Sequence, residues 1–271
     1  MSIFKAGRFD ITTGKKAYIM GILNITPDSF SDGGKFCSVG DAIKQAEQML
    51  SDGADIIDIG AVSTRPFSKP VSEDEEWNRL KDILPVIIKS CNAPVSVDTF
   101  NPAIAEKCLS MGVDIINDVS GVFNPVMAEA VKGYNCAWIT MHGGVALRKA
   151  EESVEYKNGV VEDINFYFDD FIKKGVEQGI KKERIWLDAG FGFSKDIMQN
   201  VELLENFEKI KKHGLPLLCA LSRKRFIGEM SGKKNPEDRD NATLEANIRA
   251  IEKGADIIRV HNVKIHKAAL N

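Results

Sequence analysis

The sequence predicts an α/β protein that folds as a single (β/α)8 barrel, the TIM-barrel architecture. Eight strand-length apolar segments alternate with amphipathic segments along the 271 residues, and such alternation is typical of parallel strands joined by helices. A repeated hexapeptide supports the same fold, because GADIID at 53–58 recurs as GVDIIN at 112–117 and as GADIIR at 254–259. In each copy the glycine suits a helix end with positive φ, and the two isoleucines suit a buried strand. Eight parallel strands of this kind predict a closed barrel.

The elements can be placed in order from the N-terminus. Residues 4–16 predict a short N-terminal hairpin, turned at Thr12-Thr13-Gly14, that plugs the bottom of the barrel. The predicted strands lie at residues 18–23, 54–59, 94–98, 114–117, 137–141, 184–188, 215–221 and 256–260. The predicted helices lie at residues 39–51, 73–89, 102–111, 125–132, 161–178, 197–212 and 241–253. The sequence stops at Asn271, so we expect a truncated or short final helix, and one domain over residues 1–271.

Composition excludes several classes of protein. Hydrophobic residues make up 44% of the chain, with 22 Gly and 9 Pro, which is enough for a large core. A net charge of -3 gives no indication of a nucleic-acid partner. The N-terminal residues lack an apolar signal core and no apolar run approaches membrane-spanning length, so we expect a cytoplasmic protein with no membrane partner. Five dispersed cysteines without a CxxC motif predict reduced thiols and no structural zinc site.

Polar residues recur where the predicted strands end. In a barrel the carboxyl ends of all strands share one rim, so a polar residue at each end predicts a site there rather than a packing role. The rim residues predicted in this way are Asn24, Asp58, Asp98, Asn117, His142, Asp188, Ser222 and Arg259.

Three loops at this rim stand out. The segment after the first strand is longer than a plain βα connection and is rich in Gly, Ser and Asp around Phe30. The second strand is followed by Ser63-Thr64-Arg65-Pro66, and the seventh by the cations Arg223-Lys224-Arg225. A charge run is usually a solvated face. Cations that converge on a barrel mouth beside Arg65 and Arg259, however, indicate a bound anion.

Eight motifs carry a family resemblance. They are GILNITPDSFSDGG (21–34), STRP (63–66), VSVDTF (95–100), INDVSG (116–121), MHGG (141–144), LDAGFGFSK (187–195), SRK (222–224) and RVHNV (259–263). Through these motifs, which occur in family order, the chain resembles dihydropteroate synthases, the folate-pathway transferases targeted by sulfonamides. The resemblance implies a homodimeric (β/α)8 barrel that uses Mg2+. It also implies that 4-aminobenzoate is joined to (7,8-dihydropterin-6-yl)methyl diphosphate, giving 7,8-dihydropteroate and pyrophosphate.

The resemblance also assigns a pterin pocket. Asp98, Asn117, Asp188 and Lys224 match the family's pterin-binding positions, and Met141 and Phe193 would line the ring. The chemistry agrees, because a pterin presents alternating donors and acceptors that carboxylate, amide and ammonium groups can satisfy.

The remaining assignments concern the diphosphate and the aminobenzoate. The residues that match the anion and metal positions are Asn24, Thr64, Arg65, Arg259 and His261, with the Asn24 carbonyl oxygen offered to Mg2+. Phe30 and Pro66 would wall the aminobenzoate ring. Its carboxylate would meet Ser222, Arg225 or backbone N–H groups at the start of the seventh helix. The residues expected to carry catalysis are Asp98, Asp188, Lys224, Arg259 and His261, whereas His142 is expected only to orient its neighbours.

Departures from the family pattern leave two alternatives open. Val62 stands where the family usually has an acid and Phe67 where it has glycine, and Asn262 replaces a common Asp. One alternative is a pterin-dependent methyltransferase, which would need no diphosphate pocket. Thr64-Arg65 and the Arg259-x-His261 pair argue against it. The other alternative is a non-catalytic pterin-binding paralogue.

Overall fold

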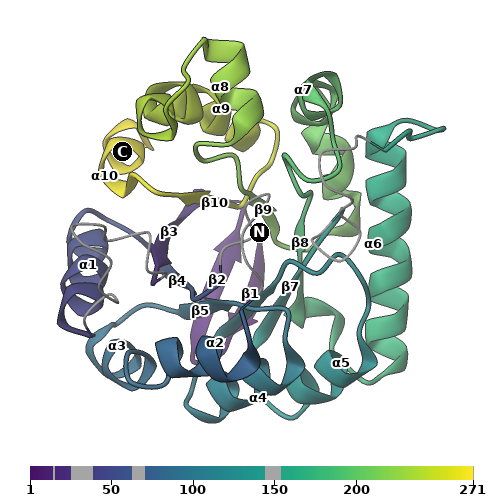
Figure 1. Ribbon diagram of the computed structural model, residues 1–271. Coiled ribbons are helices and arrows are strands. Elements are labelled where there is room, and N and C mark those ends of the chain that lie inside the picture. The colour runs from purple at the N-terminus through teal and green to yellow at the C-terminus, as the bar shows by residue number, and fades with distance from the viewer. Residues whose placement is uncertain (15, 26–38, 63–70, 144–153, 271) are drawn as a thin grey trace.

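Eight parallel strands close into a barrel in the computed structural model, which describes residues 1–14, 16–25, 39–62, 71–143 and 154–270. The strand order around the barrel is β10-β3-β4-β5-β6-β7-β8-β9 (Figure 1). The strands are β3 (Tyr18–Asn24), β4 (Ile56–Gly60), β5 (Val95–Asp98), β6 (Ile115–Asp118), β7 (Ala137–Met141), β8 (Ile185–Asp188), β9 (Leu217–Cys219) and β10 (Ile257–Val260). The predicted fold class is therefore confirmed.

Helices surround the strands on the outside of the barrel (Figure 1). They are α1 (Val39–Ser51), α2 (Glu73–Leu80), α3 (Leu84–Ser90), α4 (Pro102–Ser110), α5 (Pro125–Lys132), α6 (Val160–Glu177), α7 (Ile197–Glu205), α8 (Arg225–Ser231), α9 (Asp240–Glu252) and α10 (Val263–Leu270). The described residues also form the 3-10 helices η3 (Lys182–Arg184), η4 (Phe207–His213) and η5 (Pro236–Arg239). Within the described residues, no helix combines the length and the apolarity needed to cross a membrane.

Local chemistry explains where several helices begin. Asn101 and Asn124 each accept a backbone N–H of the following turn, and a proline occupies the first turn of both helices. Asp196 and Gln199 form a reciprocal capping box at the start of α7. Such caps satisfy N–H groups that have no partner inside the helix.

The core follows from strands that are buried on both faces. Every residue of β4, β5, β6, β7 and β8 is buried. Trp138 and Phe171 pack edge to face between the barrel wall and α6, with ring centroids 4.8 Å apart. This packing makes the wall rigid, so that the strand ends can hold side chains at fixed positions.

The N-terminal hairpin is formed by β1 (Ser2–Ala6) and β2 (Phe9–Thr13), which pair antiparallel. The predicted turn at Thr12-Thr13-Gly14 is wrong, because the chain turns at Gly7 and Arg8 instead. Gly7 takes a φ of 56°, and the Arg8 backbone N–H and guanidinium both donate to the Asp114 carboxylate. Since Asp114 directly precedes β6, the hairpin lies against the amino-terminal end of the barrel.

Three predicted boundaries also needed correction. The helix predicted at 73–89 divides into α2 and α3, because Pro85 has no N–H to continue the ladder and its ring opposes the carbonyl of residue 81. The strand predicted at 215–221 shortens to β9, which begins after Pro216. The helix predicted at 197–212 ends at Glu205 and continues as the 3-10 helix η4.

Candidate active site

Strand register brings the predicted pterin residues together at one rim. Asp98 at the end of β5 pairs in register with Asn117 of β6, and also with Gly60 of β4. Asp188 at the end of β8 is in register with Met141 of β7. The carboxyl ends of these neighbouring parallel strands therefore form one arc, in which the apolar Met141 of β7 lies between the polar residues of β6 and β8.

A buried carboxylate organises the centre of this arc. Asp58, which has no exposed surface, accepts hydrogen bonds from Ser96 Oγ at 2.5 Å, Arg259 Nε at 2.6 Å and Asn117 Nδ2 at 3.3 Å. Arg259 Nη2 donates to Asp98 Oδ2 at 2.9 Å, so that one guanidinium bridges two acids. Sequence reasoning placed Asp58 on the rim but gave it no site role. The sequence did contain an indication of this contact, because Asp58, Asn117 and Arg259 are the last residues of the three copies of the repeated hexapeptide.

Burial controls the charge of the acids at the mouth. Burial raises the pKa of Asp98 to about 7, while Arg259 opposes this shift and Asp58 reinforces it. Burial also raises the pKa of Asp118 to about 6, against hydrogen bonds from Ser120 and Trp138. The pKa of Asp188 is raised by burial as well, and Lys224 opposes that shift. Asp98 can therefore act as a hydrogen-bond acceptor or as a donor near neutral pH.

One acceptor in the arc has no partner. Asn117 Oδ1 is buried and lacks a hydrogen-bond partner among the residues that the structure describes. Asp188 Oδ1, by contrast, accepts the backbone N–H of Gly190 at 2.8 Å. A buried amide oxygen without a partner is costly, so this atom marks a position suited to a ligand donor.

The loop between β8 and α7 forms the wall of the site. Phe193 packs with Met141 and Val119 in a small apolar cluster separate from the main core. Lys224 Nζ lies 4.0 Å from the centre of the Phe193 ring and donates to the Phe191 carbonyl oxygen at 2.5 Å. The structure thus brings together Met141, Phe193 and Lys224, and it adds Val119, which the sequence did not single out.

A buried lysine holds this loop from behind. Lys195 Nζ lies 3.0 Å from the Gly190 carbonyl oxygen, 3.1 Å from that of Phe193 and 3.0 Å from His142 Nδ1. Burial lowers the pKa of Lys195 to about 7, and the charge of Asp188 opposes this shift. Sequence reasoning missed Lys195, because a lysine at the end of a loop is ordinarily solvated.

His142 connects this lysine to the outer helices. Its Nε2 lies 2.9 Å from Asp163 Oδ2 on α6, so the Nε2–H tautomer leaves Nδ1 to accept from Lys195. Burial lowers the pKa of His142 to about 4, despite the opposing hydrogen bond to Asp163. The geometry agrees with an orienting role for His142.

Ser222 and His261 form a second polar pair on the rim. Ser222 Oγ lies 2.9 Å from His261 Nδ1 and accepts the His261 backbone N–H at 3.1 Å. The sequence assigned Ser222 to the aminobenzoate and His261 to the diphosphate. Their direct contact means that the two predicted subsites share a boundary.

The cation run at 223–225 does not converge on the mouth as expected. Arg223 is engaged by Asp240 of α9, with Nε–Oδ1 at 2.7 Å and Nη2–Oδ2 at 2.9 Å. Arg225 is largely exposed and pairs with Glu229 along α8 at 3.2 Å. Lys224 contacts the Phe191–Phe193 segment, and the backbone of Arg223, the residue before it, is left-handed.

The predicted metal ligand Asn24 ends β3 beside Gly60 and Asp98. A Cβ at Gly60 would lie 3.4 Å from Asn24 Oδ1 and 4.0 Å from Asp98 Oδ2, so the glycine leaves room beside two oxygen atoms. Within the described ranges, no cluster of three His, Cys, Asp or Glu side chains is arranged to hold a metal. The remaining predicted residues, Phe30, Thr64, Arg65 and Pro66, lie outside the described residues.

Comparisons with known proteins identify a family model, a relative and solved structures that resemble this chain. The pterin binding enzyme family model matches residues 20–261. A dihydropteroate synthase from Staphylococcus haemolyticus is 40% identical over 253 residues, which cover 93% of this chain and 91% of that protein. The structure of Xanthomonas albilineans dihydropteroate synthase with 4-aminobenzoic acid superposes with a TM-score of 0.91 at 34% identity, covering 99% of this chain and 95% of that one. The same enzyme in complex with 7,8-dihydropteroate gives a TM-score of 0.88 at 32% identity, covering 99% and 96% of the two chains.

Proposed function

The chain belongs to the pterin binding enzyme family, among the dihydropteroate synthases, and on that premise we propose a reaction for its barrel mouth. The enzyme joins 4-aminobenzoate to (7,8-dihydropterin-6-yl)methyl diphosphate and releases 7,8-dihydropteroate and diphosphate. The observation that carries this proposal is the arc of Asp98, Asn117 and Asp188 beside Phe193 and Lys224. It offers a flat apolar wall with an edge of mixed donors and acceptors.

The pterin binds against this arc. Asp98 and Asp188 accept from its N–H groups, and Asn117 Oδ1 is available for a further donor, since it has no partner among the described residues. Phe193 and Met141 stack against the ring. Lys224, held over Phe193, supplies a charged donor to the ring's oxygen or nitrogen atoms.

The diphosphate binds next to the pterin methylene group, near Arg259 and His261. Arg259 already bridges Asp58 and Asp98, so the same guanidinium connects the pterin edge to the anion. Thr64 and Arg65 belong to this subsite in our proposal, although they lie outside the described residues. Arg is well suited to bidentate recognition of phosphate oxygens.

Mg2+ fits the oxygen donors at this position. Asn24 Oδ1 and Asp98 Oδ2 both lie beside the space above Gly60, and Mg2+ prefers such oxygen ligands together with water and substrate phosphates. We propose Asn24 as the protein ligand. When bound, Mg2+ would neutralise charge on the leaving diphosphate.

The aminobenzoate lies on the outer side of the mouth. Ser222, in the loop before α8, and Arg225, the largely exposed first residue of α8, would meet its carboxylate. Phe30 and Pro66 would contact its ring. Ser222 is held by His261, so the carboxylate subsite and the diphosphate subsite adjoin.

The chemical step is a substitution at the pterin methylene carbon. The carbon–oxygen bond to diphosphate breaks and the leaving group keeps the electron pair. The arylamine lone pair then forms the carbon–nitrogen bond, and the amine proton passes to solvent. Positive charge that develops on the pterin is stabilised by Asp98 and Asp188, and negative charge on the diphosphate by Arg65, Arg259 and His261. The chain acts mainly by positioning, because an arylamine is already a nucleophile.

A condensation assay tests this function. The chain is mixed with the pterin diphosphate and 4-aminobenzoate, with Mg2+ or with EDTA, and both diphosphate and dihydropteroate are measured. We expect equimolar products that depend on both substrates and on Mg2+ and that decrease with a sulfonamide. Pterin binding without diphosphate release would instead support the non-catalytic paralogue. Methyl transfer from a methylated folate would support the methyltransferase.

We also propose that residues 1–271 act as one domain, in a homodimer, in the cytoplasm. The four cysteines described by the structure, Cys91, Cys108, Cys136 and Cys219, are free and buried, which supports a reducing compartment. Sedimentation of the purified chain at several concentrations tests the dimer.

A further inference from the structure

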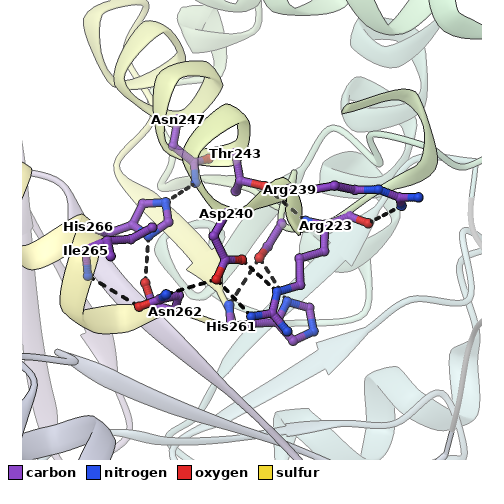
Figure 2. A network of polar contacts seen from close by, with 10 residues as sticks. Arg223, Arg239, Asp240, Thr243, Asn247, His261, Asn262, Ile265 and His266 are labelled. Atoms are coloured by element: carbon purple, nitrogen blue, oxygen red, sulfur yellow. Dashed lines mark hydrogen bonds and ion pairs between the residues drawn. The ribbon is translucent and has the colours of Figure 1, made fainter. Parts of the chain in front are cut away.

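Arg223 holds an unusual backbone conformation between two residues of the proposed site. Its φ is 58°, a left-handed value that residues other than glycine rarely adopt. Three contacts keep it there. The Arg223 N–H donates to Thr243 Oγ1 at 3.2 Å, its carbonyl oxygen accepts from Arg239 Nη1 at 2.9 Å, and its guanidinium binds both oxygens of Asp240 (Figure 2). Strain of this kind persists only where several contacts determine the conformation, and it is concentrated at functional sites.

The turn at Arg223 sends its two neighbours to different parts of the mouth. Ser222, before it, contacts His261. Lys224, after it, reaches the Phe191 carbonyl oxygen and the Phe193 ring. A relaxed backbone at Arg223 would change the direction of at least one of these side chains.

Asp240 also holds the second rim segment. Asn262 Nδ2 donates to Asp240 Oδ2 at 2.9 Å, directly after His261 in the chain (Figure 2). Asn262 directly precedes α10, and its Oδ1 accepts the Ile265 N–H at 3.4 Å while its carbonyl oxygen lies 2.7 Å from His266 Nδ1. One carboxylate on α9 therefore contacts both the loop that carries Lys224 and the segment that carries His261.

We propose that Asp240 is a positioning residue for the reaction, acting through Arg223 on Ser222 and Lys224 and through Asn262 on His261. This inference rests on the proposed function, since it concerns how accurately that site is assembled. Asp240 does not contact the proposed substrates, and its effect is exerted through the two segments that it ties together.

Asn262 supplies the donor on which this second contact of Asp240 depends. An amide can donate to Asp240 while the carboxylate keeps its ion pair with Arg223. An aspartate at this position, common in the family, would place a second carboxylate against Asp240 and leave the donor out. The variant Asn262→Asp therefore changes the contact without changing the size of the side chain.

The experiment compares three near-isosteric or shape-conserving variants, Asp240→Asn, Arg223→Met and Asn262→Asp. Kinetic constants for both substrates and the thermal midpoint are measured for each. The control is Arg249→Met. Arg249 lies on α9, as Asp240 does, and its Nη2 is 2.5 Å from Oε2 of the exposed Glu205. We expect kcat/KM to fall by about tenfold to a hundredfold in the three variants, as misplacement of a site group typically causes. The control should stay within about twofold.

A double-mutant cycle separates positioning from simple loss of stability. If Asp240 acts on Ser222 and Lys224 through Arg223, the double variant Asp240→Asn/Arg223→Met should be no worse than the worse of the two single variants. A fall in thermal midpoint with kcat/KM of the folded fraction unchanged would overturn the proposal, as would fully additive losses. If the unsubstituted chain releases no diphosphate, the proposed function fails instead, and the two failures are thus distinguishable.

Discussion

Arg259 Nε lies 2.6 Å from Asp58 Oδ2, and this contact joins β10 to β4 through two residues that are 201 positions apart in the chain. The same Asp58 oxygen also accepts from Asn117 at 3.3 Å. A single buried carboxylate therefore connects the residue proposed for the diphosphate with one proposed for the pterin. Because Asp58 is fully buried, its charge is weakly screened and its effect on both neighbours is strong.

Asp58→Asn should impair both stability and turnover. Asparagine keeps the shape but removes the charge that Arg259 faces, so we expect the free energy of unfolding to fall by about 2 kcal/mol. We also expect kcat/KM to fall by about a hundredfold, because Arg259 and Asn117 lose their common anchor. The measurements are denaturant unfolding and steady-state kinetics. Asp52→Asn, at an exposed acid that contacts Gln48, is the control, and equal effects from both variants would contradict this role.

Binding of the pterin substrate should depend on pH through Asp98. Its pKa is raised by burial to about 7, with Arg259 opposing and Asp58, Glu76 and Asp118 reinforcing the shift. If the ionised form accepts from the pterin, kcat/KM rises with pH on a limb centred near that value. Asp58→Asn removes a neighbouring negative charge and should move this limb to lower pH. Asp98→Asn should abolish it, and a limb that persists in that variant belongs to another group.

The same pKa shift has a consequence for stability. A carboxyl whose folded pKa exceeds its unfolded pKa stabilises the fold at low pH, and this contribution is lost as pH rises through the folded pKa. For Asp98 the window lies between its ordinary value of 3.8 and about 7. Asp98→Asn should therefore flatten the decline in the free energy of unfolding across this window. An unchanged slope in urea titrations at several pH values would count against the raised pKa.

Lys195→Met should loosen the wall of the pterin pocket. Methionine has a similar length but leaves the Gly190 and Phe193 carbonyl oxygens and His142 Nδ1 without their donor. We expect a loss of about 2 kcal/mol in the free energy of unfolding. We also expect a higher KM for the pterin substrate and a smaller change in the KM for 4-aminobenzoate. Lys174→Met removes an exposed pair with Asp170 on α6 and is the matched control; a pterin KM equal to that of the control would exclude this role.

Gly7→Ala tests the hairpin at the opposite end of the barrel. A Cβ at Gly7 would lie 2.2 Å from Asp114 Oδ1, and the φ of 56° is itself unfavourable for alanine. We expect a loss of about 1–3 kcal/mol in the free energy of unfolding, with kcat/KM unchanged because the site lies at the other end. Gly14→Ala has a similar φ of 79° but no atom closer than 3.8 Å, so it isolates the backbone effect from the clash. Equal losses in both variants would show that the contact with Asp114 contributes little.

The sequence was sufficient to predict the fold and the arc of polar strand ends. Periodicity identified the strands, and in parallel strands the carboxyl ends meet at one rim whatever the loops do. The repeated hexapeptide places Asp58, Asn117 and Arg259 at equivalent positions. Their contact, however, depends on the register between strands, which the pattern of apolar residues does not define.

Other features depended on partners distant in the sequence. Gly7 and Gly14 both have positive φ, and only the contact of Arg8 with Asp114, 106 residues away, determines that the hairpin turns at Gly7. Likewise, the sequence places Arg223 among the cations of the mouth, whereas in the structure it is bound by Asp240 of α9. Lys195 could not be recognised as buried from its neighbours in sequence, because the acceptors around it come from the folded loop after β8 and from His142, which follows β7.

The recurrence of one hexapeptide also bears on how such a site could originate. Its three copies end in an acid, an amide and a base, and in the folded chain the amide and the base both donate to the acid. If the copies descend from one duplicated ancestral unit, exchange of a single codon at an equivalent place in each would have been enough to diversify the chemistry. The barrel strands that carry these residues would not have needed to change.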